Sequence, residues 1–316
     1  MDKIYNKKAF KTSIGGQALI EGVLMKGPSK IAIAVRKPDD DIELKIDDIN
    51  DLSKKYKILS FPIIRGAYKL FDAMYTGINA LTYSASFWED SEEVEKESIL
   101  DKVVKDEKKK NNILTSLAIL FSFAVAMLLF MVIPSLAAGL LREYTHNTVI
   151  LNLIEGIIRL LIFGAYLYYV SKLEDIRRVF EYHGSEHKTI HCYEAGDELT
   201  VENVKKYPIV HPRCGTSFLF MVMMISIIVL SFFGWPNPVM RIISRIIALP
   251  VIAGIAYEIN RLIGRSNSKL CRVLAVPGLK IQKLATVREP DDKMIEVAIE
   301  SLKAVLPKEG ESDRWQ

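Results

Sequence analysis

Three of the five histidines in this 316-residue chain fall within nine positions, in the stretch "EYHGSEHKTIHCYEAG" at residues 181–196. Imidazole, thiol and carboxylate groups are the side chains that bind zinc in proteins. A helix turns by about 100° per residue, so His183, His187, His191 and Glu194 would share one helix face. His183 and His191 would lie about 12 Å apart along the axis, too far to bind one ion together easily. The spacing therefore predicts a metal ion held either by His183 with His187 or by His187 with His191.

Two alternatives complete this site. The segment "HGSEH" at residues 183–187 matches the H-x-x-E-H pattern of inverted zincins, in which two histidines hold zinc and the glutamate, here Glu186, activates water. Alternatively, His211 and Cys214 of "HPRC" join the helix in a His/Cys zinc site, either structural or catalytic. Glu194 is a further candidate ligand. Without a metal, the same histidines would hydrogen-bond lipid headgroups, the backbone and one another.

Long apolar runs indicate a membrane protein. Residues 113–141 hold 29 residues without a formal charge, more than the roughly 20 that cross a bilayer core. Three further apolar runs follow at 148–170, 215–234 and 242–259. The sequence thus predicts a mainly α, polytopic helical membrane protein with about four transmembrane helices.

Basic residues suggest the orientation of these spans. The connection 142–147 holds one arginine, whereas the connection 171–213 holds seven lysines and arginines: Lys172, Arg177, Arg178, Lys188, Lys205, Lys206 and Arg213. Because lysine and arginine collect on the cytoplasmic side, residues 171–213 are expected there. The opening residues lack the apolar core of a cleaved signal peptide. We expect a protein of the cytoplasmic membrane with both termini in the cytoplasm.

Two compositional features bear on partners. Three cysteines facing a reducing compartment do not indicate a disulfide framework. The net charge of +4 is small and scattered, which argues against nucleic acid as a partner. The expected partners are membrane lipids and other membrane proteins, with a homo-oligomer as a further alternative.

The region before the spans is expected to carry a small β-containing unit. Residues 31–35 and 42–46 flank a Pro-Asp turn and predict a hairpin. Residues 61–88 have aromatic side chains at helical spacing. This helix could cover the hairpin or lie in the membrane interface, and the pattern favours the interface.

Two further patterns concern charges and helix breaks. Glu155 and Arg159 lie four positions apart inside the second apolar run, so they are expected to pair. A pair that neutralises itself is favoured, and in the alternative of a polar track Arg245 and Glu258 of the fourth run would be the partners. In the C-terminal tail, residues 270–284 form an amphipathic segment that Pro277 and Gly278 are expected to break. A last helix is predicted at residues 291–306.

These patterns divide the chain into six segments. They are an N-terminal β-hairpin unit (1–57), an interfacial helix with a charged linker (58–110), transmembrane helices 1 and 2 (111–170), a cytoplasmic His/Cys-rich loop (171–213), transmembrane helices 3 and 4 (214–260) and a cytoplasmic amphipathic tail (261–316).

Three long segments carry a family resemblance: "GGQALIEGVLMKGP", "EYHGSEHKTIHCYEAGDELTVENVKKYPIVHPRCGTSF" and "PGLKIQKLATVREPDD". With them the chain resembles the bacterial YqhQ family from about residue 13 to residue 300. Proteins of that family are usually described as predicted metal-dependent membrane enzymes. The resemblance implies that six residues belong to the family's motifs: His183, Glu186, His187, His191, His211 and Cys214.

Two functions remain open. The first is a hydrolase with a divalent metal, zinc by its ligands, acting on a membrane-associated substrate. His183 and His187 would hold the metal, Glu186 would be the general base, and one or more of His211, Cys214 and Glu194 would complete the ligand set. The second is a non-catalytic scaffold or assembly factor for other membrane proteins, in which the histidine cluster is structural. A transporter is less attractive because the spans hold few polar groups and no repeated halves.

Overall fold

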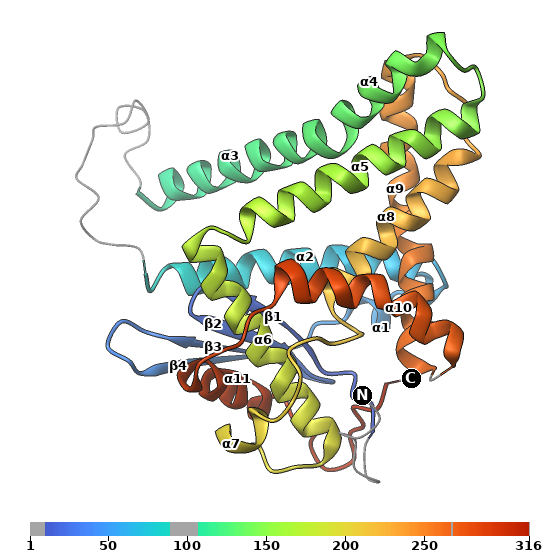
Figure 1. Cartoon of the computed structure of the whole chain (residues 1–316). Helices are drawn as coiled ribbons and strands as arrows, with labels where there is room; N and C mark the ends of the chain where they lie inside the picture. Colours follow the sequence, from blue (N-terminus) through green and yellow to red (C-terminus); the bar gives the residue numbers. More distant parts are fainter. Residues whose placement is uncertain (1–9, 89–106, 267, 316) are drawn as a thin grey trace. The chain divides into compact units, whose positions relative to one another are not determined.

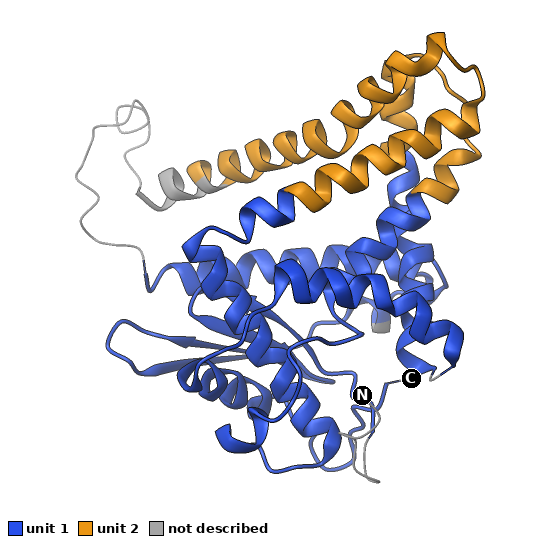
Figure 2. Ribbon diagram, in the orientation of Figure 1, with its two compact units in different colours: residues 1–88, 166–226, 247–316 blue, residues 89–165, 227–246 orange. Residues whose placement is uncertain are grey.

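The computed structural model describes residues 10–88, 107–266 and 268–315 (Figure 1). The chain divides into two compact units (Figure 2). Unit 1 contains residues 1–88, 166–226 and 247–316, and unit 2 contains residues 89–165 and 227–246. The fold is mainly helical with a small N-terminal β-sheet, as predicted. Most of the predicted charged linker, at residues 89–106, lies outside the described residues.

The N-terminal sheet has four antiparallel strands in the order β1-β2-β3-β4. The strands are β1 (Gly15–Leu19), β2 (Gly22–Lys26), β3 (Lys30–Arg36) and β4 (Ile42–Asp48). The predicted hairpin is β3 with β4, in which Ile33 lies opposite Lys45. Two strands precede this hairpin, and β1 forms one edge of the sheet.

Helices of unit 1 cover both faces of this sheet. Because side chains alternate along a strand, Val23 and Met25 face α6 (Glu174–Ala195) and α11 (Asp292–Ala304), with which they form a buried apolar cluster. Leu24 faces the other way and packs with Ala80 of α2 (Ile64–Ala85). The helix predicted at residues 291–306 is α11, and its buried apolar side chains belong to the core. Its N-cap is Asp291, whose side chain accepts a hydrogen bond from the Met294 N–H at 2.8 Å.

Helix α2 has two different faces. Its small residues Gly77, Ala80 and Ser84 are buried, and Gly77 lies directly against the side chain of Gln17 in β1. Its aromatic residues Phe71 and Tyr75 are 59% and 73% exposed. The less favoured alternative, that this helix covers the strands, is therefore confirmed for one face. The other face presents apolar side chains to the surroundings.

Three described helical segments are long and apolar enough to cross a membrane: Ser116–Glu143, Thr148–Val170 (α5) and Pro238–Arg265 (α9). The first of them comprises part of α3 (Glu107–Met127), a π-helical turn (Leu128–Val132), α4 (Ile133–Gly139) and a 3-10 turn (Leu140–Glu143). The run predicted as the third span forms α8 (Gly215–Ser231), which is an apolar helix of 17 residues.

The predicted charge pair lies buried in unit 2. The Glu155 Oε1 accepts from Arg159 Nη2 at 2.8 Å, and its Oε2 lies 2.7 Å from Arg245 Nη2. Both pairings match the prediction. The prediction was wrong for Glu258, which pairs instead with Arg65 of α2, where Arg65 Nε donates to Glu258 Oε1 at 2.6 Å. Helical periodicity locates a charge on a face but does not identify a partner on a distant helix.

The C-terminal segment departs from its prediction. Helix α10 (Lys269–Ile281) runs through Pro277 without ending and continues into a π-helical turn (Gln282–Thr286). Gly278 is buried against Ser217, so tertiary packing overrides the break expected from the Pro-Gly pair. The remaining short elements are α1 (Leu52–Lys55), a 3-10 turn (Lys57–Ser60) and α7 (Val201–Val204).

Candidate metal site

Helix α6 carries most of the predicted site residues. It begins with Glu174 and Asp175, which favour the positive end of the helix dipole. It ends at Gly196, whose φ of 77° allows a left-handed C-cap. The segment predicted as a cytoplasmic loop is thus largely a 22-residue helix whose second half is buried. Arg178 pairs with Glu21 in the β1–β2 turn, which fixes the helix against the sheet.

A first cluster joins His183, His187 and Cys214, whose potential ligand atoms all lie within 4.8 Å of one another. Backbone carbonyls orient both rings. The His183 Nδ1 donates to the Thr286 carbonyl at 2.8 Å, and the His187 Nδ1 donates to the Ile209 carbonyl at 2.6 Å. A carbonyl oxygen can only accept, so both Nε2 atoms carry the lone pair and face the cluster.

The donor atoms of this cluster fit a metal ion. The His183 Nε2 lies 3.1 Å from Cys214 Sγ, and the His187 Nε2 is buried without a hydrogen-bond partner among the described residues. Ligands of a tetrahedral zinc ion lie about 3.5 Å apart, so small side-chain rotations would bring all three to one centre. Metal-binding histidines typically donate their other ring N–H to a carbonyl, as both do in this site. Three protein ligands leave a fourth position open, which is typical of catalytic zinc sites.

Glu186 lies beside this cluster. Its Oε1 accepts a hydrogen bond from the Gly16 N–H at 3.0 Å, and its Oε2 is buried without a partner among the described residues. Burial raises the pKa of Glu186 to about 7. Burial also lowers the pKa of His187 to about 4, which keeps this imidazole neutral and able to bind a cation.

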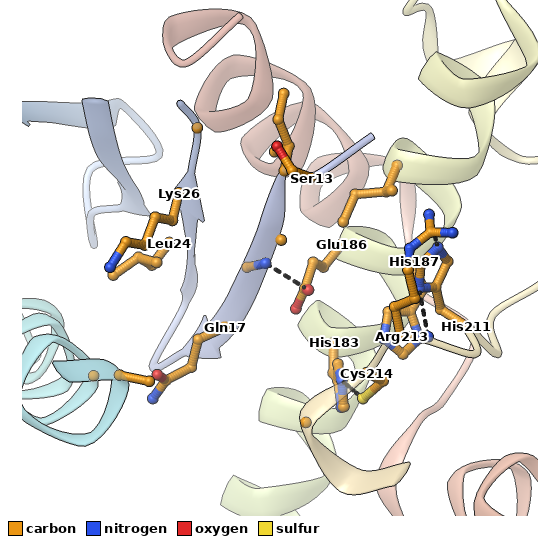
Figure 3. Close-up of a pocket in the computed structure, with 18 of the residues that line it drawn as sticks. Ser13, Gln17, Leu24, Lys26, His183, Glu186, His187, His211, Arg213 and Cys214 are labelled. Atoms are coloured by element: carbon orange, nitrogen blue, oxygen red, sulfur yellow. Dashed lines mark hydrogen bonds between the residues drawn. The ribbon is translucent and has the colours of Figure 1, made fainter. Parts of the chain in front are cut away.

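Glu186 and the first cluster line a pocket of about 310 Å³ (Figure 3). The pocket lies within unit 1. One side is formed by the segment 13–17, which includes most of β1, and another by residues of α2. The remaining predicted ligand in the lining is His211. A small substrate could therefore reach both the carboxyl group and the potential metal ligands.

A second cluster joins His191, Glu194 and His211. An arginine lies within it: Arg213 Nη2 pairs with Glu194 Oε1 and lies 3.3 Å from His211 Nε2. The same Glu194 Oε1 accepts from the Thr12 N–H at 2.7 Å. The His191 Nε2 donates to the Val210 carbonyl at 3.0 Å. Burial lowers the pKa of His191 and His211. The guanidinium group thus already provides a positive charge beside two of the three potential ligands.

The structure thus divides the six predicted ligands into two groups. Of the two predicted histidine pairs, His183 with His187 meets Cys214, while His191 lies with Glu194 and His211. Sequence reasoning missed Arg213, although it lies between two predicted ligands in "HPRC". It also missed Gly16, for which the only sequence signal was its place in the "GGQ" segment.

Comparisons with known proteins agree with the resemblance. The family described as "Protein of unknown function (DUF1385)" matches residues 61–308. The "Uncharacterized protein YqhQ" of Bacillus subtilis (strain 168) is 32% identical over 323 residues, which cover 98% of both chains. No solved structure matches the chain. The alignment with the Bacillus protein extends over nearly the whole chain, whereas the family match begins at residue 61, after the β-sheet.

Proposed function

The chain belongs to the DUF1385 family, whose description states no activity, and from the geometry of its site we propose that it is a divalent-metal hydrolase acting on a membrane-associated substrate. Zinc is the metal that best suits two imidazoles and a thiol. One observation carries this proposal: the Nε2 atoms of His183 and His187 and the Sγ of Cys214 converge beside the carboxyl group of Glu186 in a pocket.

Each residue of the site has a role in this proposal. His183, His187 and Cys214 bind the metal. A bound zinc ion supplies a Lewis acid that polarises a carbonyl or phosphoryl group and acidifies water. The Gly16 N–H holds Glu186 Oε1, which leaves Oε2 to take a proton from the attacking water and pass it to the leaving group. A carboxyl group with a pKa of about 7 can do both near neutral pH.

The surroundings of the site support a membrane-associated substrate. Cys214 directly precedes the apolar helix α8. Residues of α2 line the pocket, and this helix exposes Phe71 and Tyr75. Helix α10 likewise exposes Leu270 and Val273. Amphipathic helices of this kind lie in the membrane interface.

The apolar helices support a multi-pass protein of the inner membrane. Counting α8 with the three longer candidates gives four spans, and an even number puts both termini on the same side. The basic residues of the segment 171–213 favour the cytoplasmic side. Reporter domains that are active only in the cytoplasm, fused at either end, test this topology. Activity of both fusions is expected, and an inactive fusion at one end would exclude it.

The alternative is a scaffold in which the metal is structural. It is favoured by one observation, that the ligands of the first cluster would join α6 to Cys214 across 27 or more positions of sequence. The two functions differ in what they require of Glu186. A structural site needs the ligands alone, whereas a hydrolase also needs the carboxyl group.

The experiment compares three variants of the purified protein, each incubated with membranes from a strain lacking it. Products released from the membranes are measured by mass spectrometry, and metal content by elemental analysis. We expect Glu186→Gln to keep the metal and lose product formation, and His187→Ala to lose both. His146→Ala, at an exposed histidine of unit 2 that belongs to neither cluster, is the matched control. Full product formation by Glu186→Gln would exclude the hydrolase.

A further inference from the structure

Strand β1 is an edge strand whose free side faces the candidate site. The turn between Leu19 and Gly22 has two residues, so Leu19 and Gly22 form a hydrogen-bonded pair. Hydrogen-bonded pairs alternate along an antiparallel ladder, so Gly15 and Gln17 bond to β2 while Gly16 and Ala18 direct their N–H and C=O groups away from it. The hydrogen bond from the Gly16 N–H to Glu186 confirms this direction.

The free side of β1 forms one wall of the pocket. Five consecutive residues, 13–17, line it, and His183, Glu186 and Cys214 line it opposite (Figure 3). Gly15, Gly16 and Gln17 are exposed. A Cβ on Gly16 would overlap the Leu24 carbonyl, whereas a Cβ on Gly15 would meet nothing. The two glycines therefore leave the backbone of this edge bare at the site.

Two groups of this edge point away from β2 in a definite pattern. Glu186 already accepts the hydrogen bond of the Gly16 N–H. The next two groups along this edge are the Gly16 carbonyl and the Ala18 N–H, which lie on either side of Gln17. In a parallel pair of strands, one residue bonds to groups on both sides of its opposite residue. A single residue of an extended chain could thus donate to Gly16 and accept from Ala18.

The side-chain charges of the pocket do not favour an anionic headgroup as the ligand. Its lysine, Lys26, lies 2.6 Å from Asp72, and its arginine, Arg213, pairs with Glu194. Both cations of the lining are therefore neutralised by carboxylates. Arginine and lysine are the usual phosphate-binding side chains, so a phosphate headgroup would have only the bound metal ion to contact. An uncharged backbone is the better match for this wall.

We infer that the substrate is an extended polypeptide segment of a membrane protein, which binds as an added strand on the free edge of β1. This inference rests on the proposed hydrolase function. Strand addition is a general mode of peptide recognition at an exposed sheet edge. The exposed apolar side chains of α2, whose residues Ala73, Thr76 and Gly77 line the same pocket, suit a segment from a membrane protein.

The reaction on such a substrate is hydrolysis of an amide bond. The oxygen of water bonds to the amide carbonyl carbon, and the carbon–nitrogen bond breaks. Glu186 takes a proton from the water and delivers it to the departing amine nitrogen. The products are a carboxylic acid and an amine, and no oxidant or reductant is required.

A substitution in the free edge tests strand addition. Ala18→Pro removes an N–H that does not bond to β2, and proline is tolerated at such positions of edge strands. Leu44→Pro is the matched control, because Leu44 occupies the equivalent outward-facing position on β4 at the opposite edge.

The probe is a quenched fluorescent decapeptide rich in leucine and alanine, in detergent micelles with zinc-loaded protein. We expect Ala18→Pro to lower kcat/KM about tenfold with zinc content unchanged, since it loses one hydrogen bond and blocks the edge. We expect Leu44→Pro to match the native protein. Equal cleavage by native protein and Ala18→Pro would overturn the inference.

A second measurement does not depend on the folding of the proline variant. Hydrogen exchange of the Glu186→Gln protein is followed with and without the same peptide at saturation. Slower exchange in β1 with unchanged exchange in β4 supports strand addition, and unchanged exchange in β1 with peptide bound overturns it.

Vesicles of phosphatidylethanolamine and phosphatidylglycerol separate this inference from the proposed function. Zinc-dependent release of headgroups, with no peptide cleavage and no effect of Ala18→Pro, would overturn the peptide inference and leave the hydrolase standing. Peptide protection of β1 without hydrolysis of either probe would instead remove the hydrolase and keep strand addition.

Discussion

Two polar clusters lie along the same helix, α6, and both use side chains from the segment 211–214. Each has three groups of the types that bind zinc. In the second cluster, Arg213 already provides a positive charge beside Glu194 and His211. In the first, the His187 Nε2 is buried without a partner among the described residues. The difference shows that residue type and spacing identify candidate ligands, whereas the unsatisfied Nε2 of His187 identifies the site.

Electrostatics sharpens this difference. A divalent ion about 4 Å from a guanidinium group would be repelled by roughly 8 kcal/mol at an effective dielectric constant near 20. The first cluster has no cationic side chain among its three members. We therefore expect one metal ion per chain, bound by the first cluster.

The largest expected effect comes from removing the cation of the second cluster. Arg213→Met leaves Glu194 buried without its charge partner, and breaking a buried pair in this way typically costs about 3–5 kcal/mol of unfolding free energy. Urea unfolding measures the loss. The double variant Glu194→Leu/Arg213→Met is the control and should recover much of the stability. A stable Arg213→Met protein would contradict the view that this cluster is a charge-paired structural unit.

A smaller effect is expected from adding zinc to the metal-free protein. Zinc at about 100 times its dissociation constant should stabilise the native protein by about 2.7 kcal/mol. His187→Ala should show no such gain, while His211→Ala should keep it, because only His187 belongs to the first cluster. Thermal unfolding with and without zinc gives the comparison. An equal gain in both variants would mean that the clusters do not differ as described.

The smallest of these effects concerns the position of His183. A Cβ on Gly184 would overlap the Arg288 carbonyl, so Gly184→Ala should push α6 away from the segment 286–288, in which the Thr286 carbonyl holds His183. Overpacking of this kind costs about 1–3 kcal/mol. Chelator competition should show weaker zinc binding. The charge pair of Glu194 and Arg213 in the second cluster should change little. Ala195→Gly, a size reduction at the C-terminal end of α6, is the comparison variant. Unchanged zinc affinity in Gly184→Ala would show that the packing at residue 288 does not position the cluster.

Local patterns in the sequence predicted much of the fold. Alternation and a turn located the hairpin of β3 and β4, and the four-residue spacing paired Glu155 with Arg159. Helical periodicity also placed the histidines on one face of α6. These features depend on residues that are close in sequence, which is why a period of two or of 3.6 residues reveals them.

Long-range contacts were not predictable in this way. Arg65 lies 193 positions from Glu258, and Gly16 lies 170 positions from Glu186. Arg213 was counted among the basic residues of a cytoplasmic segment, yet it lies inside a cluster with Glu194. Partner choice between distant segments follows from packing, and no spacing rule in the sequence expresses it.

The most direct test is elemental analysis of the purified native protein and of two variants. The account predicts one zinc ion per chain in the native protein, one in His211→Ala and none in His187→Ala. Two zinc ions per native chain, none at all, or loss in His211→Ala with retention in His187→Ala would contradict it.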